Sequence, residues 1–375
     1  MLPLRSNQPR LGGYNWLPAF SLERLLRDLA GGREGIVARI PANDLNCVFY
    51  LYPDADSARA GRKLGGSGFW VSRPSQNIPN YHWLFAVSNK HVVHKIGASV
   101  IRANARYHTG FEIFETEPTD WIEHPAGHDI AILPISYSHV LPVVNLVTLL
   151  PEMFATVENI TAERIGIGDD VYMIGRFINH EGTPRNTPSV RFGNISMLPF
   201  EPIYIDAETK PQLSFAIELR SMCGYSGSPV FVEVGGLQRR SGGTSMGPPS
   251  QLLLGVHWGH IIEPWTVQKI IVSAKPSGLR HDEREIEQVS ANTGMNGVVP
   301  AWFLREMFDL PVVKEVLQRD EEIELKRRNE QTPGAKLDGA SSEKTAPPAN
   351  DANPNHREDF MRLVGAAARK PAQED

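Results

Sequence analysis

The chain has 375 residues, of which 41% are hydrophobic and 22% charged, and its formal net charge is −5. This balance excludes a disordered chain and a membrane-embedded one, and the length allows one large two-part unit or two small domains. With a sequence pI of about 6.2, the chain lacks the basic surface that nucleic acid or anionic lipid requires, so we expect neither as a partner.

Residues 1–35 are expected to be an extension with one short helix, because Ser21 precedes leucines at helical spacing and Gly31 and Gly32 follow them. The start of the chain lacks the apolar run of a secretory signal, and no stretch approaches the roughly 20 apolar residues that span a bilayer. Two cysteines are too few for a disulfide scaffold. By default we expect a cytoplasmic protein without a membrane partner.

From about residue 36, short apolar, β-branched and aromatic runs alternate with Gly, Pro, Asn and Asp, which is typical of an all-β sandwich or barrel. These runs are 47–51, 68–71, 84–87, 130–133, 171–174, 215–219, 229–232 and 252–256. They form two clusters, and so predict two antiparallel β-barrels, over residues 36–140 and 165–310, joined by a linker over 141–164. A terminal helix over 300–310 is expected to pack on the second barrel.

Two later segments predict little regular structure. Residues 234–250 are rich in Gly, Ser and Pro and predict a long flexible hairpin loop. Residues 311–375 carry many charges with Pro, Ala and Asn, and predict a disordered tail. Within the tail, 359–368 has apolar residues at helical spacing that could bind a protein partner, although a weak solvated helix explains the pattern more simply.

A serine lies in a glycine-flanked turn directly before an apolar strand, in the sequence Gly224-Tyr225-Ser226-Gly227-Ser228-Pro229. Small neighbours would let a carbonyl group approach its hydroxyl, and the backbone N–H groups of Gly224 and Ser226 could converge on an oxyanion. The same short motif also occurs in ordinary turns. Hydrolysis by serine needs, in addition, a base and a carboxylate that orients it.

A histidine and an aspartate stand at the ends of two predicted strands. His91 follows the run 84–87, and Asp129 comes directly before the run 130–133. Each residue alone is explained as well by a turn cap or by a strand start that bonds to local N–H groups. The two histidine pairs, His91 with His94 and His124 with His128, lack an accompanying zinc motif, so we expect no metal.

The order His91, Asp129, Ser226, with Gly66-Ser67-Gly68-Phe69 entering a strand ahead of the histidine, resembles the trypsin-like serine peptidases over about residues 45–305. The resemblance implies a double β-barrel and a serine endopeptidase that acts on polypeptides without a cofactor or metal. Ser226 would attack the peptide carbonyl, His91 would take its proton, and Asp129 would hold the imidazole. Gly224 and Ser226 would supply the oxyanion hole.

The strand over 252–260 contains Gly-Val-His-Trp-Gly, and this run resembles the glutamyl-endopeptidase branch of the superfamily. The resemblance implies a specificity pocket formed by Ser221, His257, Trp258 and Gly259, with His257 and Ser221 binding an acidic substrate side chain. A histidine satisfied within the sheet is the alternative for His257. The long segment before the first barrel strand departs from the branch, and Arg220 could replace the amino-terminal charge used there.

Other interpretations of these residues fit the sequence less well. A non-catalytic peptide-binding module on the same fold is the alternative function, since a fold does not dictate chemistry, but such a module would be expected to have lost a triad residue. An α/β-hydrolase places its serine first, which does not match this order. Cys223 has the wrong offset for the nucleophile and is expected to be a packing residue. Tyr225 replaces the aspartate that pairs with a new amino terminus in digestive enzymes, so that form of activation is not expected.

Overall fold

The computed structural model describes residues 40–63, 65–176, 182, 184–204, 210–219, 224–240, 243–274 and 280–331. Contacts divide the chain into two units, Met1–Asp44 and Leu45–Asp375. Only residues 40–44 of the first unit are described, and the 3₁₀-helix η1 (Ala42–Cys47) begins there. The expected helix within residues 1–35, the segment 359–368, and Arg220, Ser221 and Cys223 all lie outside the described residues.

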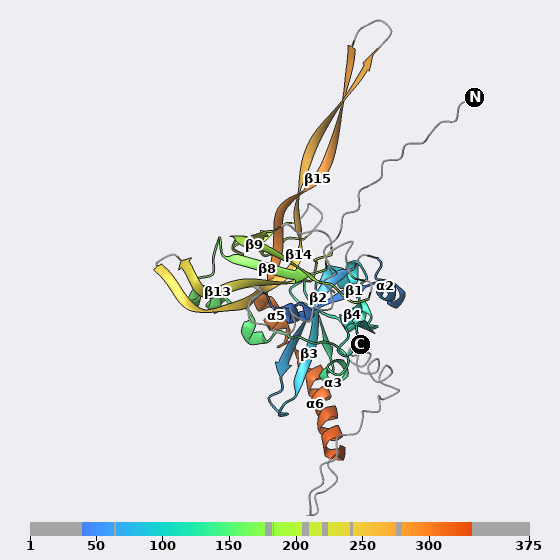
Figure 1. Ribbon diagram of the computed structural model, residues 1–375, viewed down its shortest axis with the longest axis vertical. Helices are drawn as coiled ribbons and strands as arrows, with labels where there is room; N and C mark the ends of the chain where they lie inside the picture. The colour runs from blue at the N-terminus through green and yellow to red at the C-terminus, as the bar shows by residue number, and fades with distance from the viewer. Residues whose placement is uncertain are drawn as a thin grey trace, which may run out of the picture. The chain divides into compact units, whose positions relative to one another are not determined.

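The first half of the second unit forms a seven-stranded antiparallel sheet in the order β5-β4-β1-β2-β3-β7-β6 (Figure 1). Its strands are β1 (Val48–Tyr52), β2 (Gly66–Pro74), β3 (His82–Ser88), β4 (Val100–Asn104), β5 (Phe111–Phe114), β6 (Ile122–Glu123) and β7 (Ala131–Ile135). Leu84 and Ala86 face one apolar core with Trp70, while Phe85, between them, packs on Phe308. The alternation of side chains along a strand explains why β3 is apolar over residues 83–87: both of its faces are covered there.

The second half forms a closed barrel of six strands in the order β12-β15-β14-β13-β8-β9. Its strands are β8 (Asp170–Gly175), β9 (Ser189–Met197), β12 (Phe215–Glu218), β13 (Pro229–Arg240), β14 (Gly243–Ala274) and β15 (Arg280–Pro300); β10 (Pro202–Ile203) and β11 (Gln212–Leu213) pair separately. Alternate residues such as Val171 and Met173, or Val230 and Val232, fill the barrel core. The period-2 pattern therefore places every second side chain inside.

Helices are short except at the end of the described chain. They are α2 (Ala55–Ala60), α3 (Tyr137–Val140), α4 (Val157–Ala162), α5 (Ala301–Met307) and α6 (Pro311–Gln331), with the single turns η2 (His91–Lys95), η3 (Pro118–Asp120) and η4 (Pro151–Met153). Phe308, which caps α5, contacts Phe85 of β3 with ring centroids 4.6 Å apart. The chain thus returns from the barrel to the first sheet.

Three predictions from the sequence are modified. The antiparallel, mostly β fold with one closed barrel and a C-terminal helix is confirmed, but a second barrel is not: β5 and β6 end the first sheet, and no pairing between them is found among the described residues. Within the expected loop 234–250, residues 234–240 and 243–250 are paired parts of β13 and β14, from Val234↔Ser250 to Arg240↔Gly243, and residues 241–242 lie outside the described residues. Residues Pro311–Gln331 form helix α6 rather than the start of a disordered tail.

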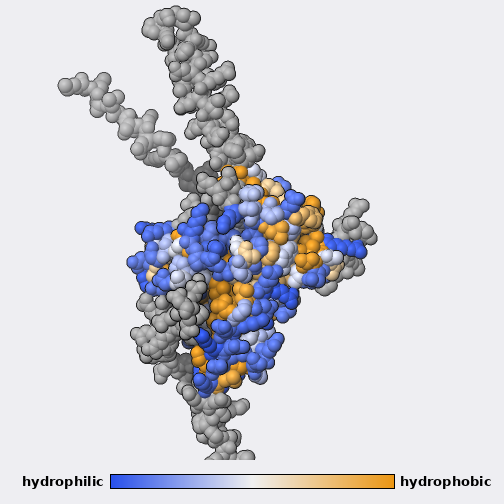
Figure 2. Space-filling view, turned by 180° about the vertical axis from the view of Figure 1, so that it is seen from behind, coloured by the Kyte–Doolittle hydropathy of each residue, from blue (hydrophilic) through white to orange (hydrophobic). Residues whose placement is uncertain are grey.

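The surface carries both polar and apolar areas. Figure 2 shows one face that is largely hydrophilic, with separate hydrophobic areas on it. Tyr107 and Phe200 are the most exposed large apolar side chains of the described part, each 79% exposed. No helix in the described ranges is both long and apolar enough to cross a membrane.

Candidate functional site

His91 and Asp129 are brought together by strand pairing. His91 begins turn η2 just after β3, and Asp129 lies just before β7. These strands are antiparallel neighbours, with Ser88 opposite Ala131. The end of one strand therefore meets the start of the other, and two residues 38 positions apart in the sequence become neighbours.

Both carboxylate oxygens of Asp129 are used by the same histidine. Oδ2 lies 2.6 Å from the ring nitrogen Nδ1 of His91, and Oδ1 accepts the backbone N–H of His91 at 2.9 Å. The side chain of His91 is 28% exposed, and that of Asp129 is 16% exposed. A carboxylate in this position accepts a hydrogen bond from Nδ1–H of the imidazole. In the neutral ring, Nε2 is then the acceptor nitrogen.

The backbone of Asp129 is held from two sides. Its N–H donates to Oε1 of Gln212 at 3.0 Å, and its carbonyl accepts from Nδ2 of Asn89 at 2.8 Å. Asn89 belongs to the turn that carries His91, whereas Gln212 comes from β11 in the second half of the chain. Residues from the first and the second half of the unit therefore both hold Asp129 in its position beside His91.

The turn that contains Ser226 rests on the start of β2. The backbone N–H of Ser67 donates to the carbonyl of Ser226 at 2.8 Å, and the hydroxyl of Ser67 donates to the carbonyl of Gly224 at 2.9 Å. Ser88, three residues before His91, donates its hydroxyl to the carbonyl of Ser67 at 2.8 Å. This chain of bonds connects the serine turn to the histidine turn.

Gly227 is required by this close approach. Its φ is +85°, and a Cβ placed there would lie 2.0 Å from the carbonyl oxygen of Ser67. Its N–H donates to the carbonyl of His257 at 2.9 Å. Only glycine combines this backbone conformation with the available space.

Ser226 is half-buried, and its hydroxyl makes no hydrogen bond to any residue that the structure describes. The carbonyl of Tyr225, the residue before it, accepts from the Ser228 N–H at 2.9 Å and faces the His257 ring at 3.2 Å. In a trans peptide the C=O and the following N–H point in opposite directions, so the N–H of Ser226 is directed away from both groups. It donates to no described residue. Gly224 has φ +96°.

His257 is 1% exposed, and both of its ring nitrogens face oxygen atoms. Nδ1 lies 3.2 Å from the Tyr225 carbonyl, and Nε2 lies 3.2 Å from Oδ1 of Asn296. The amide of Asn296 is oriented by its Nδ2, which donates to the carbonyls of Leu219 and Gly294. Burial lowers the pKa of His257 from 6.5 to about 4, so the ring is neutral at pH 7 and has one N–H to donate.

The other residues of the expected pocket are placed in part. Trp258 is 7% exposed, and its indole nitrogen lies against Gly297, where a Cβ would come within 2.2 Å. Gly259 pairs with Gly297 at an irregularity in the β14–β15 ladder. The structure therefore brings Trp258 and Gly259 beside His257 on one strand.

The buried His124 and the half-buried His128 lie against each other next to Asp129, with ring centroids 4.7 Å apart. The His128 ring stacks on Phe303 with centroids 3.7 Å apart, and its Nδ1 accepts from Nε2 of Gln212 at 2.9 Å. Burial lowers the pKa of His128 below its usual range. Within the described ranges no group of three or more His, Cys, Asp or Glu residues is placed to hold a metal ion.

Several residues of this site had no signal in the sequence. Gln212, Asn296 and Asn89 are polar residues without a motif, and their partners lie 83, 39 and 40 positions away in the chain, respectively. Ser67 did lie in a recognised motif, but its bonds to Gly224 and Ser226 depend on tertiary packing. Their roles become visible only when the strands are placed side by side.

Comparisons with known proteins add little to the geometry. No family model matches the chain, and no curated protein matches it. Among solved structures, it is similar to the inactive form of a serine-to-alanine mutant of Rv3671c from M. tuberculosis H37Rv, at 20% identity, covering 60% of this chain and 87% of that one, with a TM-score of 0.28. It is also similar to the NS6 protease from murine norovirus 1, at 16% identity, covering 64% and 87%, with a TM-score of 0.29. At these scores neither likeness carries weight for the function of the chain.

Proposed function

We propose that the chain is a serine endopeptidase of the trypsin-like kind, with Ser226 as nucleophile, His91 as general base and Asp129 as the residue that orients the base. The observation that carries the proposal is the contact of 2.6 Å between Nδ1 of His91 and Oδ2 of Asp129, with the second carboxylate oxygen on the His91 N–H. This arrangement leaves Nε2 able to accept a proton, and the turn of the half-buried Ser226 is linked to the histidine turn through Ser67 and Ser88.

The proposed reaction proceeds through an acyl-enzyme. Oγ of Ser226 attacks the peptide carbonyl carbon while its proton passes to Nε2 of His91, and the backbone N–H groups of Gly224 and Ser226 bind the oxyanion. The C–N bond then breaks as His91 returns the proton to the leaving amine. Water, deprotonated by the same imidazole, hydrolyses the ester on Ser226 and releases the acid.

The hydroxyl of Ser226 must approach Nε2 of His91 for this reaction. Hydrogen bonds of unliganded active sites are often long and tighten when substrate binds. The proposal therefore includes formation of that bond in the substrate complex. We also propose that the seven-stranded sheet is the counterpart of the first barrel of the trypsin-like fold.

We further propose that the enzyme cleaves after Glu or Asp, with Ser221, His257, Trp258 and Gly259 around the substrate side chain. Because His257 is neutral at pH 7, this preference would depend on a hydrogen bond from the ring rather than on an ion pair, and the ring N–H would have to leave Asn296 Oδ1 or the Tyr225 carbonyl to form it. A carboxamide can accept the same bond. Peptides with Gln at the cleavage position should therefore be cleaved as well, and more slowly than those with Glu.

The alternative function is a peptide-binding module that does not cleave. Incubation of the full chain with a mixed peptide library, followed by mass spectrometry of the products, separates the two. Cleavage after Glu and Asp that disappears in Ser226→Ala supports the endopeptidase. Equal peptide binding by both proteins, without products from either, supports the binding module.

A further inference from the structure

The side chain of Tyr225, immediately before Ser226, connects the nucleophile turn to a barrel strand. Tyr225 is completely buried. Its hydroxyl accepts a hydrogen bond from Nε of Arg191 at 3.1 Å and makes a second hydrogen bond with the hydroxyl of Ser189. Both partners lie on β9. The two hydrogen bonds of this phenol group, called the tether below, thus connect the turn to two positions of one strand.

The main chain of Tyr225 is fixed at its other end. Its carbonyl accepts the N–H of Ser228 at 2.9 Å and faces the ring of His257 at 3.2 Å. The carbonyl direction sets the direction of the next N–H, which belongs to Ser226. Any rotation of the Tyr225 peptide would therefore redirect the Ser226 N–H.

The tyrosine ring has no space to move toward β8. A Cβ on Gly175 would come within 2.8 Å of the ring carbon Cδ1 of Tyr225, and within 2.0 Å of the hydroxyl of Ser228. Close packing of this kind transmits displacements instead of absorbing them. The position of the Tyr225 hydroxyl on β9 and the position of its carbonyl are thus coupled through a rigid ring.

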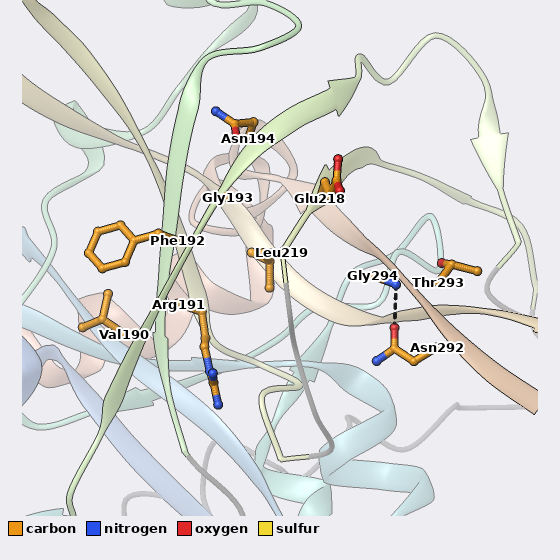
Figure 3. A pocket seen from close by; sticks show the side chains of 10 residues that line it. All are labelled: Val190, Arg191, Phe192, Gly193, Asn194, Glu218, Leu219, Asn292, Thr293 and Gly294. Carbon is orange, nitrogen blue, oxygen red and sulfur yellow. Dashed lines mark hydrogen bonds between the residues drawn. The ribbon is translucent and has the colours of Figure 1, made fainter.

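Arg191 can be reached from solvent. It lines a pocket of about 930 Å³ together with Phe192 and Asn194 of β9, Leu219 after β12, and Thr293 of β15 (Figure 3). In Figure 3 the Arg191 side chain extends along the pocket wall, away from Asn194 of the same strand. Truncation of Arg191 would leave a space that a small cation could enter from this pocket.

We infer that Ser189 and Arg191 are positioning residues, which act through the Tyr225 hydroxyl to hold the Ser226 N–H in the direction that an oxyanion needs. This inference rests on the proposed function for its catalytic consequence. A hydroxyl with two fixed partners, one of them a guanidinium, is a stronger anchor than packing alone, because hydrogen bonds to charged groups are about twice as strong as neutral ones. The turn is then held in place by the barrel itself.

The test compares Tyr225→Phe and Arg191→Ala with the control Asn194→Ala, which lies on the same strand and pocket wall but has no contact with Tyr225. Tyr225→Phe keeps the ring and removes only the hydroxyl. Hydrogen exchange followed by mass spectrometry should show faster exchange of the Gly227 and Ser228 amides in the first two proteins and no change in the control. Denaturant midpoints of all three proteins establish that they are folded.

The kinetic arm uses the peptide substrates of the wild-type protein. Loss of one oxyanion donor costs about 10²–10³-fold in kcat, so misalignment of the Ser226 N–H should lower kcat about 10- to 100-fold with KM unchanged. Added ethylguanidinium should restore part of the kcat of Arg191→Ala but not that of Tyr225→Phe. A lower kcat with equal loss in Asn194→Ala would contradict the tether.

The two arms separate the possible failures. A wild-type protein that cleaves nothing overturns the proposed function, while the exchange rates still decide whether the tether positions the turn. Unchanged exchange of Gly227 and Ser228 in Tyr225→Phe overturns the tether, whether or not the wild-type protein is active. Unchanged kcat in both variants of an active enzyme also overturns it.

Discussion

The two carboxylate oxygens of Asp129 have different partners, so the substitution Asp129→Asn tests the role of one of them. Oδ1 accepts the backbone N–H of His91, which only an oxygen can do, and Oδ2 faces the ring nitrogen Nδ1. In Asp129→Asn the amide oxygen must take the first position, so its NH₂ group faces Nδ1. The imidazole would then carry its proton on Nε2, where it cannot act as a base.

We therefore expect Asp129→Asn to lower kcat by about 10⁴-fold with little change in KM, as the wrong tautomer does in a serine triad. Steady-state kinetics on a peptide substrate measures both parameters. Asp170→Asn, an exposed carboxylate bonded to Asn194, serves as the control and should keep wild-type kcat. A loss of less than tenfold in Asp129→Asn would contradict the assigned role of Asp129.

The buried ring of His257 predicts a pH dependence of stability. Its pKa is about 4 in the folded protein and 6.5 when exposed. Between these values the unfolded chain binds the proton and the folded one does not, so the free energy of unfolding should fall as the pH drops from about 6.5 to about 4. The contribution of this residue is up to roughly 3 kcal/mol.

Urea unfolding at several pH values measures this slope. His257→Asn should flatten it relative to the wild-type protein, whereas Val312→Ala, which removes no titratable group at a side chain 40% exposed, should leave it as it is. An identical slope in the His257→Asn protein would show that another group is responsible. His128 and His124, whose pKa values are also lowered by burial, would then be the next groups to substitute.

At the scale of elements, the contact between the turn after Gly224 and strand β2 fixes the geometry of the site. Gly227 and Gly168 both have positive φ, +85° and +92°, but a Cβ on Gly227 would meet the Ser67 carbonyl at 2.0 Å, while one on Gly168 would meet nothing within 4 Å. Alanine substitutions at these two glycines therefore separate two costs in the free energy of unfolding: that of a positive φ and that of a steric clash.

Gly168→Ala should cost about 1–2 kcal/mol in free energy of unfolding, as expected for a left-handed residue with a Cβ. Gly227→Ala should cost about 1–3 kcal/mol more, because overpacking against the Ser67 carbonyl adds this much. Denaturant unfolding gives both values. Equal losses would mean that the turn moves away from β2 at no cost.

The elements that the sequence predicts correctly are those whose own side chains carry the signal. The run 84–87 is apolar because β3 is covered on both faces, and 171–174 is apolar because all four of its side chains are buried, with Val171 and Met173 in the barrel core. Segment 234–250 has only two β-branched residues, Val234 and Thr244, among many Gly, Ser and Pro, yet its backbone pairs along β13 and β14, and backbone pairing leaves little trace in composition. Helix α6 has few apolar residues in a regular stripe, so its charged sequence resembles a tail.

The same distinction applies to the site. The order and spacing of the motifs around His91, Asp129 and Ser226 predict these three as site residues. The structure places His91 and Asp129 in direct contact. The bond of Gln212 to Asp129 and the bond of Arg191 to Tyr225 connect residues 83 and 34 positions apart. Gln212 and Arg191 belong to no local sequence pattern, so only the tertiary structure reveals these two contacts.

At the scale of the whole second unit, the segment after the barrel packs on the first sheet. Phe308 is 2% exposed and contacts Phe85 of β3 and Phe154, with centroids 4.6 and 6.1 Å away. Farther along α6, Asn77 donates to Glu321 at 2.8 Å, and Tyr81 donates to Asp320. These contacts connect the end of the described chain to the β2–β3 hairpin.

Phe308→Ala should therefore lower the free energy of unfolding by about 3–5 kcal/mol, the usual cost of removing a buried ring. Calorimetry should still show one transition, because the ring belongs to the interface between α5 and the first sheet and both would unfold together. Val312→Ala, at a side chain 40% exposed on α6, is the control and should cost less than about 1 kcal/mol. Two separate transitions in Phe308→Ala would contradict this coupling.

The most direct test of an activated nucleophile at Ser226 is covalent labelling of the full chain with a fluorophosphonate probe, followed by mass spectrometry of the modified peptide. Wild-type protein should be labelled at Ser226, His91→Ala should be labelled far more slowly, and Ser226→Ala should not be labelled. Absence of labelling in folded wild-type protein, or labelling at another serine that persists in Ser226→Ala, would contradict the proposed enzyme.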